Sequence, residues 1–201
     1  MAKVIIFGDS IACGAWDESG GWALKLQQKL LTETVKSNLK TEYWVYNLSL
    51  PGATTREVLT RFESELKPRL SEDEQTIIIF ALGINDSAFN NETKQSQVPL
   101  EEFKQNLRLL ITTAKQYTDK IIFVAPSLVN EAKVDPIPWY PPFSYLNQEI
   151  SKFSQALEAE TKVVNISLVK VEKADLSLDG VHLSNPGHQA VFEAVWPKLA
   201  L

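Results

Sequence analysis

Val4-Ile5-Ile6-Phe7 runs without a break into Gly8-Asp9-Ser10 near the start of the chain. A continuous apolar run of this length is typical of a strand that is buried on both faces, as strands of parallel sheets are. The residues that follow place a hydroxyl group at the exit of that strand. We therefore predict a buried strand at 4–7 that ends in a turn carrying Ser10.

Four more apolar runs follow, each flanked by segments whose apolar residues have helical spacing. The further strands are predicted at 44–50, 76–82, 121–125 and 163–166. Apolar stripes at helical spacing predict helices through Trp22, Leu26 and Leu30; Val58, Phe62 and Leu66; Phe103, Leu107 and Leu110; Leu146, Ile150, Phe153 and Leu157; and Val191, Val195 and Leu199. Thr54 and Glu57 have the spacing of a capping box at the start of the second of these helices.

Five strand–helix units in succession predict an α/β fold. Right-handed crossovers between them give a parallel sheet of five strands with helices on both faces. We see no internal repeat or linker, so residues 1–201 are expected to form a single domain. One connection is unusual, because the segment 134–145 contains four prolines.

Composition and charge narrow the possible partners. The formal net charge is -5, and no basic stripe is present, which argues against nucleic acid and anionic membranes as partners. No apolar run approaches the ~20 residues needed to span a bilayer. Cys13 is the single cysteine, and Ser10 follows Met1 too closely for a signal peptide to precede it. We expect a cytoplasmic protein that acts on a small molecule.

The predicted topology brings several polar residues to one edge of the sheet. Ser10 follows the first strand, Gly52 the second, Asn85 the third, and Asp179 with His182 the fifth. In an open parallel sheet, the loops after the strands all emerge at the carboxyl edge, where ligands bind. These residues are therefore expected to lie near one another.

Their chemistry is that of a serine hydrolase. A serine hydroxyl becomes nucleophilic when an imidazole accepts its proton, and His182 can supply that imidazole. Asp179, three residues earlier, can hold the other ring nitrogen and stabilise the imidazolium. Backbone N–H groups of Ser10 and Gly52 and the side chain of Asn85 can donate to the oxyanion.

Four motifs in order resemble the blocks of the GDSL (SGNH) hydrolase family: Gly8-Asp9-Ser10, Leu50-Pro51-Gly52-Ala53, Gly83-Ile84-Asn85-Asp86 and Asp179-Gly180-Val181-His182. The resemblance implies a flavodoxin-like three-layer α/β/α sandwich. It also implies hydrolysis of esters or thioesters without a cofactor or metal, with Ser10 as nucleophile, His182 as base, Asp179 as its orienter, and Gly52 and Asn85 as oxyanion donors. Ile11 stands where the family motif usually has leucine.

Two other functions fit parts of the sequence. A metal-dependent hydrolase could use Asp179, His182 and His188, although these are few ligands from one segment. Chelator sensitivity would identify it. A non-catalytic flavodoxin-like module could bind a small ligand at the same edge, but the turn after the first strand has one glycine and an acid that would repel phosphate.

Individual residues also have simpler interpretations. Ser10 could only cap a helix, Gly52 could only form a turn, and Asn85 and Asp86 could be ordinary loop residues. We expect Asp86 to be structural, His188 to be solvent-facing or structural, and Cys13 to pack as a small apolar side chain. The aromatic stretch 139–143 is either loop packing or a wall of the substrate cleft.

Overall fold

The computed structural model describes residues 1–171 and 173–201 and contains a five-stranded parallel sheet. Its strands are β1 (Ala2–Gly8), β2 (Tyr43–Asn47), β3 (Gln75–Ala81), β6 (Ile121–Val124) and β8 (Ser167–Val169). Their order across the sheet is β2-β1-β3-β6-β8. Counted along the chain this is the order 2-1-3-4-5, which is the flavodoxin-like arrangement. The predicted fold class is confirmed.

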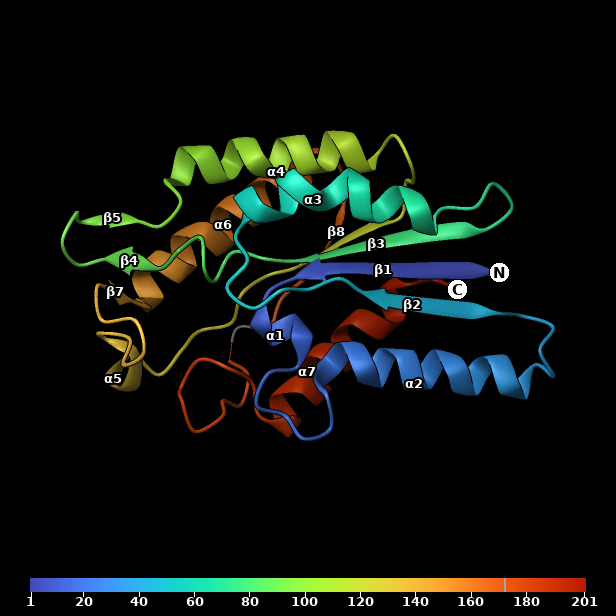
Figure 1. Ribbon diagram of the computed structural model, residues 1–201, viewed down its shortest axis with the longest axis horizontal. Coiled ribbons are helices and arrows are strands. Elements are labelled where there is room, and N and C mark those ends of the chain that lie inside the picture. Colours follow the sequence, from blue (N-terminus) through green and yellow to red (C-terminus); the bar gives the residue numbers. More distant parts are fainter. Residues whose placement is uncertain (172) are drawn as a thin grey trace.

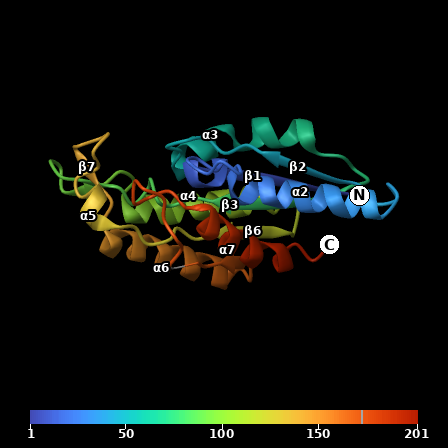
Figure 2. The same ribbon diagram turned by 90° about the horizontal axis from the view of Figure 1, so that it is seen from below.

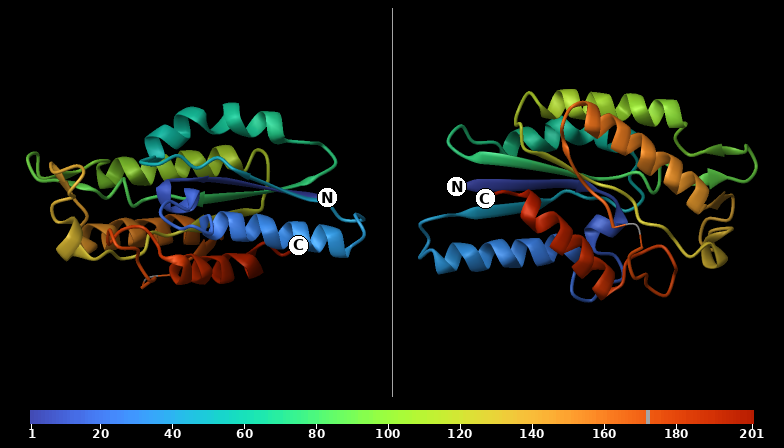
Figure 3. Two further views of the ribbon diagram at one scale, coloured as in Figure 1. Left: turned by 60° about the horizontal axis from the view of Figure 1, so that its bottom comes forward. Right: turned by 180° about the vertical axis from the view of Figure 1, so that it is seen from behind.

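The sheet has helices on both faces (Figures 1 and 3). One face is covered by α2 (Gly21–Lys36) and α7 (Asn185–Val195), which pack against each other (Figure 2). The other face is covered by α3 (Thr55–Leu66), α4 (Leu100–Ala114) and α6 (Asn147–Val163). These helices contain the five predicted apolar stripes, except that Leu146 is the N-cap of α6 and Leu199 lies beyond the end of α7.

Strand β1 is apolar throughout because both of its faces are covered. Val4 and Ile6 belong to the cluster under α2 and α7, whereas Ile5 and Phe7 belong to the cluster under α3, α4 and α6. All four side chains are fully buried. Successive side chains of a strand point to opposite faces, so a strand between two helical layers needs apolar residues at every position.

The capping box at the start of α3 is also present. The backbone N–H of Thr54 donates to the carboxylate of Glu57 at 2.8 Å, and the Thr54 hydroxyl accepts from the backbone N–H of Arg56 at 3.2 Å.

The last predicted strand was misplaced. Helix α6 continues to Val163, and the strand begins only at Ser167. Val163 is 83% exposed on the last turn of the helix, and Asn165 ends that helix region with a left-handed φ of +54°. The apolar run 163–166 therefore spans a helix end and a turn. Similarly, β2 ends at Asn47 rather than at residue 50, although Leu48 and Leu50 still donate to β1 carbonyls.

A second, three-stranded antiparallel sheet was not predicted. It consists of β5 (Gln95–Ser96), β4 (Phe89–Asn90) and β7 (Phe143–Ser144), in that order. It lies beyond the carboxyl ends of the main strands, near the short helix α5 (Glu131–Val134) (Figure 1). The proline-rich segment 134–145 thus begins at the end of α5 and passes through β7. Strands of two residues are too short for sequence periodicity to reveal.

Candidate active site

Ser10 lies at the carboxyl end of strand β1, which pairs with β2 on one side and β3 on the other. It is the first residue of the short helix α1 (Ser10–Cys13), whose N-cap is Asp9: the carboxylate accepts from the backbone N–H of Ile11 at 2.9 Å. Asp9, rather than Ser10, therefore has the capping role, which leaves the Ser10 hydroxyl available for other contacts. The turn is tight, because a Cβ on Gly8 would lie 2.5 Å from Cβ of Ala12.

His182 connects Ser10 to Asp179. Its Nε2 lies 2.8 Å from Oγ of Ser10, and its Nδ1 lies 2.5 Å from Oδ2 of Asp179. Both distances are within hydrogen-bonding range. The three side chains predicted from the two ends of the sequence thus form one continuous chain of hydrogen bonds.

The carboxylate of Asp179 is held on its other oxygen. Oδ1 accepts from the Ser177 hydroxyl at 2.8 Å and from the backbone N–H groups of Val181 and His182 at 2.9 and 3.0 Å. Burial acts to raise the pKa of Asp179, but the hydrogen bonds from Val181, His182 and Ser177 outweigh it and the pKa is lowered. Asp179 is therefore ionised at neutral pH and fixed in orientation.

Asn85 and Gly52 face the same cleft. The Nδ2 of Asn85 donates to the carbonyl of Ala53 at 3.1 Å, and its Oδ1 accepts from the Tyr145 hydroxyl at 2.7 Å. An amide nitrogen has two hydrogens, so Asn85 retains a second one for a ligand. Gly52 has a φ of +79°, a conformation that favours glycine, and a Cβ there would meet no heavy atom within 4 Å.

The cleft has a volume of about 290 Å³ and brings four of the five predicted residues to one surface: Ser10, Gly52, Asn85 and His182. Asp179 lies behind His182. The remaining lining residues are Ala15, Trp16, Pro51, Ile84, Trp139, Tyr145 and Val181. Trp139 therefore lines the cleft, as one of the two interpretations of its loop expected.

Trp16 and Tyr145 also line the cleft, and the sequence analysis missed both. Trp16 lies in the connection between α1 and α2 with a left-handed φ of +65°. Tyr145 follows β7 in the small sheet. Neither belongs to a motif or an apolar stripe. The aromatic residues of the segment 134–145 indicated that this segment could line the cleft. They did not indicate that Tyr145 contacts Asn85.

Other polar residues near these motifs have structural contacts. Asp86 is fully buried and accepts from the backbone N–H and hydroxyl of Thr55, at 3.0 and 2.6 Å, and burial raises its pKa to about 6. His188 is fully buried rather than solvent-facing, and its Nδ1 accepts from the backbone N–H of Trp22 at 3.3 Å. Burial lowers the pKa of His188 to about 4.

Cys13 is the last residue of α1, and its thiol is held by a hydrogen bond. The thiol of Cys13 donates to the carbonyl of Ser49 at 3.1 Å, and burial raises its pKa, which disfavours the reactive thiolate. Among residues 1–171 and 173–201, no group of three or more His, Cys, Asp or Glu side chains is arranged to hold a metal ion. In the same part of the chain, no helix is both long and apolar enough to cross a membrane.

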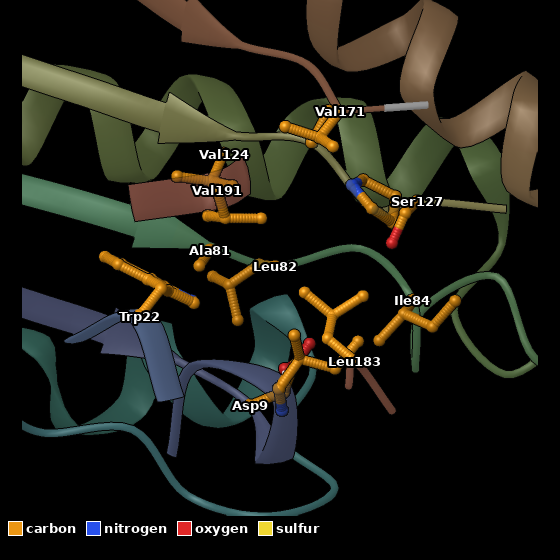
Figure 4. A pocket seen from close by; sticks show the side chains of 13 residues that line it. Asp9, Trp22, Ala81, Leu82, Ile84, Val124, Ser127, Val171, Leu183 and Val191 are labelled. Atoms are coloured by element: carbon orange, nitrogen blue, oxygen red, sulfur yellow. The ribbon is translucent and has the colours of Figure 1, made fainter. Parts of the chain in front are cut away.

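A second pocket, of about 30 Å³, is lined on one side by Asp9, from the turn that carries Ser10 (Figure 4). That volume is enough for one or two water molecules. Asp9 and Ser127 are its polar members among the described lining residues, and Asp9 is the one acidic side chain labelled in Figure 4. Burial raises the pKa of Asp9 to about 7, although backbone hydrogen bonds oppose this. Ile84 lines both this pocket and the cleft.

Comparisons with known proteins identify the family of this chain. The model of the GDSL-like lipase/acylhydrolase family matches residues 6–190. The human isoamyl acetate-hydrolyzing esterase 1 homolog is 24% identical over 210 residues, which cover 98% of this chain and 81% of the relative.

Two solved structures share the fold. The lipase/acylhydrolase from Enterococcus faecalis has a TM-score of 0.75 at 20% identity, covering 100% of this chain and 97% of the other. The acetylxylan esterase Axe2 from Geobacillus stearothermophilus has a TM-score of 0.72 at 20% identity, covering 100% and 94%. Since the family model spans nearly the whole chain, including all four sequence motifs, this protein belongs to the GDSL-like lipase/acylhydrolase family and is an esterase or acylhydrolase.

Proposed function

We propose that this enzyme hydrolyses carboxylic esters through an acyl-enzyme formed on Ser10. The observation that carries the proposal is the hydrogen-bonded chain from Oγ of Ser10 through His182 to Asp179. As Oγ attacks the ester carbonyl carbon, Nε2 of His182 takes the hydroxyl proton, and the ionised Asp179 stabilises the imidazolium. His182 then returns the proton to the leaving alkoxide, and water releases the acid by the same steps.

The oxyanion is assigned three donors. These are the backbone N–H groups of Ser10 and Gly52 and the second hydrogen on Nδ2 of Asn85. The first contact of Nδ2, to the carbonyl of Ala53, fixes the direction of the second hydrogen before substrate binds. Donors fixed in advance stabilise charge that develops only in the transition state.

The substrate proposed is a neutral ester with a short acyl group. Among the described residues lining the cleft there is no lysine, arginine, aspartate or glutamate. An acyl-coenzyme A thioester carries several phosphate charges, and this cleft offers no side-chain cation to hold them. The human relative is named for isoamyl acetate, a neutral acetate ester. The ester therefore ranks above the thioester.

The test of the nucleophile is covalent labelling. A fluorophosphonate should modify Ser10 stoichiometrically, as located by peptide mass spectrometry, and abolish hydrolysis of p-nitrophenyl acetate. Ser10→Ala should be inactive, and Ser10→Ala combined with His182→Ala should be little worse than either alone, because the members of a triad act as a unit. Labelling at another residue, or full activity in Ser10→Ala, would overturn the mechanism.

The same assay tests the metal alternative and the substrate class. EDTA should leave the activity unchanged, whereas inactivation with rescue by a divalent ion would favour a metal-dependent hydrolase. A panel of p-nitrophenyl esters of increasing acyl length, acetylated sugars and acyl-coenzyme A thioesters should show highest kcat/KM for short neutral esters. Ser10→Ala is the control for background hydrolysis.

A further inference from the structure

We infer that Tyr145 is a positioning residue that fixes the side-chain amide of Asn85 with its nitrogen toward the oxyanion. The inference rests on the proposed function of Asn85, and it assigns a role to the segment that the small antiparallel sheet holds in place. It is carried by the hydrogen bond of 2.7 Å between the Tyr145 hydroxyl and Oδ1 of Asn85.

The two contacts of Asn85 determine how its amide is turned. The carbonyl of Ala53 can only accept a hydrogen bond, so the amide atom 3.1 Å from it must be the nitrogen. The oxygen of the amide then faces Tyr145, and the phenol must donate to it. Rotating the amide by half a turn would place Oδ1 of Asn85 against the carbonyl oxygen of Ala53, and the two oxygens would repel each other.

Tyr145 keeps the proton that it donates to Asn85. Its side chain is 9% exposed, and burial raises the pKa of the phenol, with the carboxylates of Asp9 and Asp179 adding to the shift. The hydroxyl therefore keeps its proton throughout the pH range in which an esterase works. Asn85 is itself only 7% exposed, so water has little access to replace this donor.

The main chain around Tyr145 is anchored on both sides. Its backbone N–H donates to the carbonyl of Val134 at 3.1 Å, and the preceding strand β7 pairs with β4. The hydroxyl of Ser144 donates to Asp135 at 2.5 Å and accepts from Asn91 at 2.9 Å. The ring of Tyr145 belongs to an apolar cluster with Ile84 and Val181. The phenol thus reaches Asn85 from a fixed position.

Loss of the phenol hydroxyl would release one side of the amide. Oδ1 of Asn85 would then be buried without a donor, and the contact with the carbonyl of Ala53 alone would still hold the amide. Any rotation that brings Oδ1 toward the developing oxyanion repels the charge which Asn85 is proposed to stabilise. The penalty falls on the transition state, since an ester carbonyl in the ground state carries much less negative charge.

Tyr145→Phe is the direct test, because it removes the hydroxyl and keeps the ring. We expect kcat for p-nitrophenyl acetate to fall roughly tenfold with KM unchanged, the effect of losing about one hydrogen bond. Tyr140→Phe is the matched control: Tyr140 lies in the same segment, is 52% exposed and stacks on Phe143, and its variant should keep the wild-type kcat.

A double-mutant cycle separates positioning from packing. In the Asn85→Ala background, Tyr145→Phe should have no further effect on kcat, because the amide that it positions is gone. The same fold-loss in both backgrounds would overturn the inference, as would an unchanged kcat in Tyr145→Phe or an increase in KM alone.

Inhibitor binding gives a second measurement that does not depend on turnover. A trifluoromethyl ketone forms a charged tetrahedral adduct with a serine. Tyr145→Phe should therefore raise the Ki of this inhibitor by the same factor by which it lowers kcat. Thermal unfolding identifies a temperature at which the variant is folded. Equal Ki values for wild type and variant would overturn the inference. If Ser10→Ala is active, the proposed function itself fails; if Ser10→Ala is inactive and Tyr145→Phe behaves as wild type, only the role of Tyr145 fails.

Discussion

The indole ring of Trp16 meets the imidazole ring of His182 edge-on, with ring centroids 5.8 Å apart and ring planes at 82°. Trp16 is 73% exposed, and its φ of +65° is a conformation that bulky residues rarely adopt. A left-handed backbone costs such a residue about 1–2 kcal/mol, and burial of this side chain offsets little of it. Strain of this kind beside the proposed base is more consistent with contact to substrate than with packing.

The first prediction therefore compares Trp16→Gly with Trp16→Ala. Both variants lose the ring and should lower kcat/KM for esters of larger alcohols by a similar factor. Trp16→Gly should be more stable than Trp16→Ala by about 1 kcal/mol in urea unfolding, because glycine adopts the left-handed conformation without strain. Equal stabilities would show that the backbone of residue 16 is not left-handed in solution.

The second prediction concerns Asn85 alone. Asn85→Ala should lower kcat by roughly 10²-fold with little change in KM, because a side-chain oxyanion donor acts mainly in the transition state. Steady-state kinetics on p-nitrophenyl acetate measure both parameters. Gly52→Ala does not test the oxyanion donor directly, because the variant keeps the backbone N–H of residue 52. Its expected loss of activity comes from backbone strain at a φ of +79°. An unchanged kcat in Asn85→Ala would remove Asn85 from the site.

The third prediction is a pH dependence of stability that comes from Asp9. Its pKa in the folded protein is about 7, against an ordinary value of 3.8, so between these pH values the folded state binds more protons than the unfolded state. Stability contributed by Asp9 is therefore present below pH 4 and is lost as the pH rises through about 7.

Asp9→Asn removes this titration and keeps a side chain that can cap α1. The Tm of Asp9→Asn minus that of wild type should increase by roughly 5 °C between pH 5 and pH 8, as measured by calorimetry. His188 titrates in both proteins, so its contribution cancels in the difference, whereas the electrostatic interaction between Asp9 and Asp86 is part of what Asp9→Asn removes. A difference that is constant with pH would mean that Asp9 is not buried as a titrating group.

Whether a structural feature of this protein could be predicted from the sequence depends on whether it leaves a regular pattern along the chain. The apolar run at 4–7 and the helical stripes predicted the layers correctly, because burial on one or two faces leaves a periodic trace in the sequence. The four motifs predicted which side chains meet, because parallel strands bring their carboxyl ends to one edge. His182 and Ser10 are 172 residues apart and still lie within hydrogen-bonding distance.

Features that leave no regular pattern of apolar residues were missed by the sequence analysis or predicted at the wrong position. The run 163–166 looked like a strand, since three of its four residues are apolar, but Val163 ends a helix and faces solvent. Asp9 took the capping role that Ser10 could have had, and both residue types suit an N-cap equally. The contact between Tyr145 and Asn85 depends on strands of two residues that pair across more than 50 positions, which no local pattern reports.

The last prediction addresses specificity through Trp139. This side chain is 55% exposed and lines the cleft, on a segment stiffened by prolines. A stiff segment presents a large ring at low entropic cost, which suits an apolar alcohol or acyl group. Trp139→Ala should leave hydrolysis of p-nitrophenyl acetate nearly unchanged, because the acetyl group is too small to reach the ring.

For a p-nitrophenyl ester with a longer acyl group, which can reach the ring, kcat/KM should fall by about tenfold or more, which corresponds to ~1.4 kcal/mol. Tyr140→Ala is the matched control, because Tyr140 is the neighbouring exposed aromatic residue and stacks on Phe143. It should affect neither substrate selectively. If Trp139→Ala instead slows both substrates equally and lowers Tm, the ring packs the fold, and selection of the substrate falls to Trp16 and the other walls of the cleft.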